Sequence, residues 1–504
     1  MEGQETVVTA EHHGDRLSPL DASFLQLESE HAHMQVAWCA MLSPPEDVGP
    51  PSIEDVRARI AARLEWVPRC RQRLLSAPLG LGEPQWVDDS DFDVANHVVE
   101  LGDRAEPLSA ERFAAVRDEL LSEPLDLTQP LWQLALIPRL ADERMAVIGR
   151  VHHAMADGTA AMQVAMLGLD VEDAPETPAR WRPESAPTWL QRVLDPLVSR
   201  AEATTHAALD VARACARPRA MTRGALRDAG RVGQSLAEDL LPRAPGSQLN
   251  RTLGPRRTLV QHRVPLARLG DVARDTAATR NDAGLAAIAG ALRALALERD
   301  ATTEPLKALV PVNMRRGRES GDLGNRVSMT SVWLPLQLPT PAERLEHVRR
   351  QTRRFKRGAR AQGARTLLSG LGFLPSSLRA PFLRAATPRR FNLTISSVPG
   401  PPKTLYMHGA RLEEIYPVVP MTEEQALSIG MLAYDGHMHF GLFADPDALP
   451  HATRLAELID DELDALHDAG PPDAPLPVVA PAAARPLGTY EDRPVPSPTE
   501  AGHP

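Results

Sequence analysis

The stretch Val151-His152-His153-Ala154-Met155-Ala156-Asp157-Gly158 decides how this chain is interpreted. Two adjacent histidines are followed, after three small or apolar residues, by an Asp-Gly pair. An imidazole is the side chain best suited to moving a proton near neutral pH. The acid four positions after His153, followed by a glycine, predicts a tightly shaped turn that fixes this imidazole. The segment therefore predicts an acid–base centre.

The flanking sequence places the histidines on a loop between a strand and a helix. Residues 145–151 are largely apolar and predict a buried strand, and residues 159–166 have helical periodicity. Rigid scaffolds commonly display reactive groups on such loops. Two other interpretations of the pair remain open, a metal-site fragment and a polar loop patch. Zinc is disfavoured because the usual ligand spacing and a matching Cys or His cluster are missing, so we expect no metal.

Length and composition narrow the class of protein. A chain of 504 residues exceeds the size at which one core keeps growing, so two domains are expected. The net charge of −10 argues against nucleic acid as a partner, because phosphate binding needs a basic face. Three scattered cysteines favour a reducing cytoplasm. No secretory signal is visible, and the most apolar stretch, 284–297, is too short to span a membrane.

Periodicity divides the chain into two α/β blocks with a connector between them. We expect a disordered N-terminus over 1–14, a first domain carrying the histidine motif over 15–171, a Pro-rich linker and helical connector over 172–250, a second domain over 251–470, and a disordered Pro-rich tail over 471–504. Expected helices include 53–63, 110–121 and 283–297, and expected strands of the second block are 306–312, 326–334, 392–396, 427–434 and 437–443.

Three further features each leave two interpretations open. Asn281-Asp282 is either the N-cap of the apolar helix after it or a source of an amide that donates to an oxyanion. Trp132, in Pro130-Leu131-Trp132, belongs to the core or to the wall of a pocket. The nine basic residues between Arg344 and Arg365 form a solvated helix face or a surface for lipid headgroups or cofactor phosphates.

Several standard reaction centres are missing from the sequence. There is no Walker loop, no dinucleotide fingerprint, no CxxC and no G-x-S-x-G elbow around Ser396 or Ser397. A histidine base without an obvious protein nucleophile favours direct transfer of an acyl group from donor to acceptor. In such a reaction His153 activates a substrate hydroxyl, which then attacks an acyl thioester.

Several ordered motifs resemble those of the bacterial wax ester synthase/acyl-CoA:diacylglycerol acyltransferase family. The segment 152–158 fits its HHxxxDG motif, and Pro130-Leu131-Trp132 and Asn281-Asp282 fit its PLW and ND elements. The blocks 19–25 (PLDASFL), 311–315 (PVNMR), 324–328 (GNRVS) and 398–401 (VPGP) follow in the expected order. The resemblance covers about residues 17–469. One departure is Ser397, which stands where the family often has Asn.

The resemblance implies an α/β fold of two domains similar to CoA-dependent acyltransferases of the chloramphenicol acetyltransferase type, with a tunnel at their interface. It implies that His153 is the general base, that His152 is a positioning or pocket residue, and that Asp157, followed by Gly158, holds the loop. Asn281 and Asp282 stay candidates for an oxyanion site or pocket, and Trp132 stays a candidate for the pocket wall. No permanently bound cofactor is expected, and acyl-CoA is the co-substrate. The acceptor would be diacylglycerol or a long-chain alcohol.

The resemblance also implies a cytoplasmic enzyme in peripheral contact with the inner face of the plasma membrane or with lipid droplets. Two alternatives remain open at this point. The same histidine motif marks condensation-type acyltransferases whose donor is bound to a carrier protein, and the basic segment could dock such a carrier. A non-catalytic protein that binds lipid surfaces is the other alternative.

Overall fold

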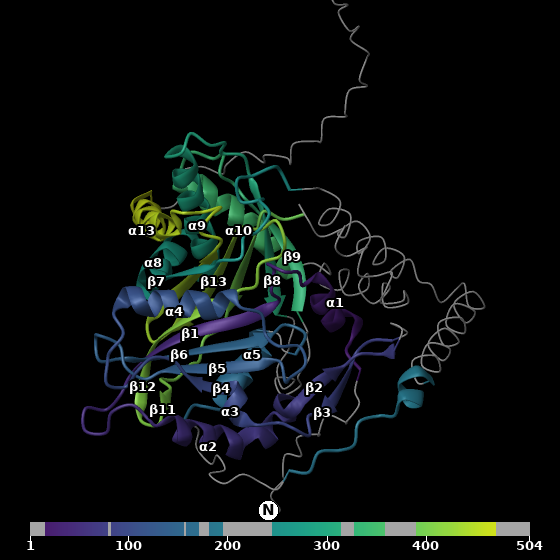
Figure 1. The fold of residues 1–504 in the computed structure, drawn as a ribbon. Helices are drawn as coiled ribbons and strands as arrows, with labels where there is room; N and C mark the ends of the chain where they lie inside the picture. Colours follow the sequence, from purple (N-terminus) through teal and green to yellow (C-terminus); the bar gives the residue numbers. More distant parts are fainter. Residues whose placement is uncertain are drawn as a thin grey trace, which may run out of the picture.

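Two six-stranded sheets organise the computed structural model of the chain (Figure 1), which describes residues 16–78, 82–155, 158–170, 181–194, 244–313, 327–357 and 390–469. The strand order of the first sheet is β11-β12-β1-β6-β5-β4, and that of the second is β7-β14-β13-β10-β8-β9. A separate hairpin joins β2 to β3. Helices accompany both sheets, so the fold is α/β with two lobes.

The first lobe is built mainly from the N-terminal third of the chain. Its strands are β1 (Gln35–Ser43), β4 (Val98–Glu100), β5 (Trp132–Ile137), β6 (Met145–His152), β11 (Tyr406–Met407) and β12 (Ala410–Val418), with the hairpin β2 (Gln72–Leu75) and β3 (Gln85–Asp88). Its helices are α1 (Pro19–Leu27), α2 (Ile53–Arg63), α3 (Val94–His97), α4 (Ala110–Ser122) and α5 (Gly158–Met166), and short 3-10 turns cover Leu64–Trp66 and Pro68–Arg71. Strand β6 is buried along its whole length.

The second lobe packs its helices around one long apolar helix. Its strands are β7 (Thr258–Pro265), β8 (Leu306–Asn313), β9 (Val327–Leu334), β10 (Leu393–Val398), β13 (Leu427–Tyr434) and β14 (His437–Ala444). Its helices are α8 (Leu266–Thr276), α9 (Arg280–Leu297), α10 (Pro341–Arg357) and α13 (Ala452–Ala469). Helix α9 is buried on nearly all sides because α8, α10 and α13 all pack against it.

The first sheet contains two strands from near the C-terminus. Strand β12 pairs antiparallel with β1 in a register that places Ala37 opposite Val418, and β11 extends the same edge. The sequence predicted two consecutive blocks, with 251–470 forming the second, and the structure differs at this segment. The strand over 410–418 is not among those expected from periodicity, and local periodicity carries no information about which sheet a strand joins.

Helix α4 and strand β7 connect the two lobes. Figure 1 shows α4 lying between β7 and the first sheet. The Asp118 carboxylate accepts hydrogen bonds from the Thr258 hydroxyl at 2.7 Å and from the Leu259 backbone N–H at 3.2 Å. Arg117 donates to the Gln261 side chain at 2.7 Å. These partly buried polar contacts fix the angle at which the second sheet meets the first.

Most of the elements predicted from periodicity are confirmed. The helix expected over 53–63 is α2, the strand expected over 427–434 is β13, and the other predicted helices and strands match to within three residues at each end. In the predicted connector, residues 189–194 are helical. The predicted disordered ends, 1–14 and 471–504, lie outside the described residues.

Candidate active site

The histidine pair lies where β6 ends beside the start of β1. His152 is the last residue of β6 and stands opposite Gln35 in the antiparallel register. Its backbone N–H donates to the Leu131 carbonyl at 2.9 Å, and the N–H of His153 donates to the Met34 carbonyl at 2.7 Å. The sequence placed both histidines on the loop, whereas the first still belongs to the strand. The backbone of the pair is therefore held from both sides.

The ring of His152 is enclosed, with 1% of the residue exposed. Its Nδ1 accepts a hydrogen bond from the Ala154 backbone N–H at 3.0 Å, so in the neutral ring the proton lies on Nε2. That Nε2 is 3.4 Å from the Glu28 carboxylate. These two contacts hold His152 in one orientation. Glu28 also acts on a second histidine: burial lowers the pKa of His33, and the Glu28 carboxylate opposes this shift.

His153 is half-buried, and its ring is stacked on an aromatic side chain. The ring centroids of His153 and Phe24 are 3.9 Å apart, and the ring planes differ by 11°. Phe24 is 7% exposed and belongs to α1. Parallel stacking of this kind fixes the direction of the imidazole plane. His153 is therefore the more accessible histidine of the pair.

Helix α1 forms because its first turn is strongly capped. The Ser18 hydroxyl accepts a hydrogen bond from the Asp21 backbone N–H at 3.1 Å and donates to the Asp21 carboxylate at 2.7 Å. Pro19 occupies the first helical position, where a missing N–H costs nothing. Glu28 is the C-cap residue of the same helix. Helix α1 thus carries both Phe24 and Glu28 to the histidine pair.

The rest of the motif is described only in part. Asp157 lies outside the described residues, so its predicted role in holding the loop stays a prediction. Gly158 is the first residue of α5, in agreement with the predicted strand–loop–helix arrangement.

The Asn281-Asp282 pair lies in the first turn of α9, and its two members differ in environment. The N-cap is Thr279, not Asn281, and Asp282 completes a capping box with it. The Asp282 carboxylate also accepts a hydrogen bond from the Thr352 hydroxyl of α10 at 2.6 Å. Asp282 is 2% exposed, so its carboxylate is engaged in holding α9 to α10. Asn281 has a buried Oδ1 without a hydrogen-bond partner among the described residues.

The sequence left Trp132 either in the core or in the wall of a pocket, and the structure places it in the core. The residue is 1% exposed, and its indole N–H donates to the Cys70 carbonyl at 2.8 Å. Its ring stacks on His97 at 4.9 Å between centroids. His97 Nδ1 lies 2.9 Å from the Trp132 carbonyl, and burial lowers the pKa of His97 against the opposing effect of this hydrogen bond. Trp132 therefore supports the sheet directly beside the histidine pair.

The basic segment is used largely for packing where the structure describes it. Arg344 is 3% exposed and pairs with Glu462 of α13 at 2.5 Å. Arg349 pairs with Glu346, and Arg353 donates to the Ala277 carbonyl at 2.9 Å. Arg344 is therefore not part of a surface for anions. The side chains from 354 to 365 lie outside the described residues.

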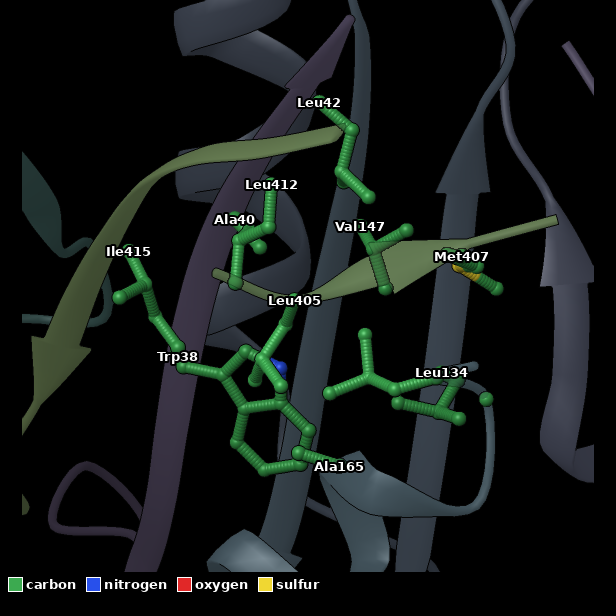
Figure 2. Close-up of a pocket in the computed structure, with 12 residues that line it drawn as sticks. Trp38, Ala40, Leu42, Leu134, Val147, Ala165, Leu405, Met407, Leu412 and Ile415 are labelled. Carbon is green, nitrogen blue, oxygen red and sulfur yellow. The ribbon is translucent and has the colours of Figure 1, made fainter. Parts of the chain in front are cut away.

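Two cavities are lined by described residues. The first holds about 30 Å³ and is almost entirely apolar; Figure 2 shows its lining residues on β1, β5, β6 and the β11–β12 segment, with Trp38, Val147, Leu405 and Met407 among them. The second holds about 60 Å³ and lies near the C-terminal end of α9, beside Leu295. Neither cavity is lined by His153. The tunnel between the lobes stays a prediction.

Phe24 and Glu28 are site residues that our reasoning from the residues did not identify. The only signal for Phe24 in the sequence is its position in the PLDASFL block at 19–25, whose contacts no spacing rule reveals. In the described part of the chain, no group of three or more His, Cys, Asp or Glu residues could hold a metal ion. Among the same residues, no helix has the length and apolar character needed to cross a bilayer.

Sequence comparison gives two domain matches and several relatives of similar length. The wax ester synthase/diacylglycerol acyltransferase catalytic domain matches residues 17–284, and the WS/DGAT C-terminal domain matches residues 323–467. The probable diacylglycerol O-acyltransferase tgs1 of Mycobacterium tuberculosis is 31% identical over 456 residues, which cover 89% of this chain and 94% of the relative. The probable diacylglycerol O-acyltransferase tgs2 of the same species is 30% identical, with coverage of 90% and 99%.

Solved structures of similar fold come from two kinds of protein. A wax ester synthase/diacylglycerol acyltransferase from Marinobacter aquaeolei has a TM-score of 0.62 and 24% identity, with 90% of this chain and 99% of that chain covered. The starter condensation domain of rhizomide synthetase has a TM-score of 0.56 and 17% identity, with coverage of 91% and 96%. At these identities the likeness establishes the two-lobed α/β fold.

Proposed function

The chain belongs to the wax ester synthase/diacylglycerol acyltransferase family, and from this premise we propose that it transfers a long-chain acyl group from acyl-CoA to the hydroxyl of diacylglycerol. Long-chain alcohols are proposed as second acceptors. The relatives at 30–31% identity, which are named as probable diacylglycerol O-acyltransferases, support this choice of acceptor. That the chain is an acyltransferase follows from the family.

The observation that carries the proposed mechanism is the placement of His153. It stands at the exit of a fully buried strand, with its backbone bonded to Met34 and its ring stacked on Phe24. A half-buried imidazole held in this way is suited to act as a general base. The neighbouring His152 is enclosed and bonded to Ala154, which supports a positioning role.

In the proposed reaction His153 takes the proton of the acceptor hydroxyl while the acceptor oxygen attacks the thioester carbonyl. A tetrahedral oxyanion forms, and a donor such as the Asn281 amide would stabilise it. The C–S bond then breaks, and the leaving CoA thiolate takes the proton back from His153. The products are the acylated acceptor and free CoA, and no covalent enzyme intermediate or permanently bound cofactor is needed.

The test is release of free CoA by the purified chain with palmitoyl-CoA and diacylglycerol in phospholipid vesicles, with the lipid product identified by mass spectrometry. We expect His153→Ala to lower kcat by roughly 10²–10⁴-fold, as removal of a general base does. The exposed His451 gives a matched control, because His451→Ala removes the same group from the residue that precedes α13 in the second lobe. Equal CoA release by the two variants would reject the mechanism.

Two details of the proposal are tested in the same assay. If an acyl-loaded carrier protein replaces palmitoyl-CoA as the better donor, the choice of donor is wrong and the condensation-type alternative holds. Peripheral contact with a lipid surface is supported by the exposed side chains of Trp189, Leu190 and Leu194. Protein that stays in the supernatant when the vesicles are sedimented would contradict this contact.

A further inference from the structure

The rings of Phe24 and His153 are held in a more defined geometry than is needed to pack a histidine against the core. The two rings are nearly parallel, at 3.9 Å between centroids. Phe24 cannot turn away easily, because α1 is capped by Ser18 at its start and packs into the core of the first lobe. The Ser23 hydroxyl adds a 2.5 Å hydrogen bond to the Leu20 carbonyl within the same helix. The aromatic face is therefore presented to the imidazole in a fixed geometry.

The face of a phenyl ring attracts a cation more strongly than it attracts a neutral ring of the same shape. In the proposed reaction His153 is neutral when the acceptor binds and becomes an imidazolium as it takes the hydroxyl proton. The additional attraction that appears only after proton transfer lowers the barrier, whereas the attraction present throughout does not. A cation over a partly buried aromatic face is favoured by roughly 2- to 5-fold.

We propose that Phe24 is a positioning residue that fixes the plane of His153 and stabilises its protonated form during acyl transfer. The inference rests on the proposed role of His153 as the base. It assigns a purpose to the PLDASFL block at the start of the chain, which is to deliver the aromatic face to the reacting imidazole. The phenyl ring itself exchanges no proton and forms no bond to substrate.

The charged and titratable groups near the histidine pair remain constant when only the phenyl face is altered. Among the described residues, these groups are His152 on β6 and Glu28 at the end of α1. His31 and His33 precede β1, and Arg257, which precedes β7, donates to the His31 carbonyl. A change confined to the ring electrons of residue 24 therefore isolates the effect of the stack.

The experiment replaces Phe24 in the full chain with 4-fluoro-, 3,5-difluoro- and 3,4,5-trifluorophenylalanine. Added fluorine withdraws electrons from the ring face with little change in shape. We expect the acidic limb of the kcat–pH profile to move stepwise to lower pH, by about half a pH unit across the series, with kcat falling roughly 2- to 5-fold and KM unchanged. The same analogues at the buried Phe443 of β14 are the matched control and should leave the profile unchanged.

A second measurement does not depend on turnover. The ring of His153, followed by NMR in ¹³C-histidine-labelled protein and assigned with His153→Gln, should show the same stepwise shift of its titration midpoint. A midpoint and a kcat that do not change along the fluorine series overturn the inference, even if Phe24→Leu is less active, because that pattern indicates packing alone. If wild-type protein releases no CoA, the proposed function fails, while the titration still decides whether the stack stabilises the charge.

Discussion

At the scale of single residues, the two adjacent histidines have different environments. The ring of His152 is enclosed, accepts a hydrogen bond from the Ala154 backbone N–H and lies near Glu28. The ring of His153 is partly accessible and is stacked on Phe24. The difference follows from their positions, because His152 is the last residue of the fully buried strand β6, whereas His153 lies in the turn that follows it. The pair therefore provides one residue that is held in place and one that can meet a substrate.

The contact between Glu28 and His152 gives a prediction at this scale. Glu28→Gln removes the carboxylate charge that lies 3.4 Å from the Nε2 of His152, and loss of a polar pair of this kind costs about 1 kcal/mol. We expect kcat to fall roughly 5- to 10-fold, because the histidine loop is less firmly held. The measurement is CoA release at saturating palmitoyl-CoA.

The exposed Glu30 provides the control for this change. Glu30→Gln alters the same chemical group two residues further along, outside the enclosed site. Its kcat should match that of the wild type. A Glu28→Gln variant with the kcat of Glu30→Gln would show that the carboxylate does not support the pair.

At the scale of elements, α4 is the helix that ties the site to both lobes. Its C-terminal end receives two hydrogen bonds from Gln35 of β1 and two from Arg150 of β6, all to main-chain carbonyls between residues 120 and 123. Burial lowers the pKa of Arg150 to about 10, so the guanidinium remains charged at neutral pH. A cation at this position also complements the negative end of the helix dipole. The strands that carry the histidines are thus fixed to α4.

Removing this guanidinium is expected to destabilise the chain strongly. Arg150→Met leaves the Leu120 carbonyl without its 2.6 Å donor and should lower the free energy of unfolding by about 3 kcal/mol. Arg139→Met, which removes an exposed pair with Glu143, should cost less than about 0.5 kcal/mol. Urea denaturation measures both. Equal losses in the two variants would mean that the buried arginine does not anchor α4.

At the scale of the whole molecule, the crossing of β12 joins the lobes. To reach the first sheet, this strand passes over Gly430 and Gly441, which stand opposite each other on β13 and β14. A Cβ on Gly441 would lie 2.0 Å from the Pro417 carbonyl oxygen, and one on Gly430 would lie 2.7 Å from it. Two glycines facing each other are thus required for the close approach of the β12 backbone.

This approach predicts a large effect from a single methyl group. Gly441→Ala should force β12 away from the second sheet and lower the free energy of unfolding by about 3 kcal/mol. Activity should fall as well, because β12 pairs with β1, whose other neighbour is β6. Thermal or urea unfolding measures the first effect and CoA release the second.

A glycine in open space is the matched control. A Cβ on Gly246 would meet nothing within 4 Å, so Gly246→Ala should leave the free energy of unfolding nearly unchanged. If Gly441→Ala is as stable and active as Gly246→Ala, the close packing of β12 on this glycine pair is not required for the fold.

The sequence by itself determined the positions of several helices and strands and the residue suited to move a proton. Apolar periodicity is a local property, so 53–63, 145–151 and 427–434 were identified without knowledge of their partners. The identity of His153 as a candidate base is equally local, since imidazole is the side chain suited to proton transfer. The ordered motifs also indicated the family.

Only the tertiary structure decided which distant segments come together. That Phe24 and Glu28 reach the histidines, that β12 joins the first sheet, and that Arg344 is buried against Glu462 all depend on contacts across long stretches of chain. Such contacts are selected by how the surfaces of complete elements fit and by which buried polar groups find partners. Neither property can be calculated from the residues on either side of a position.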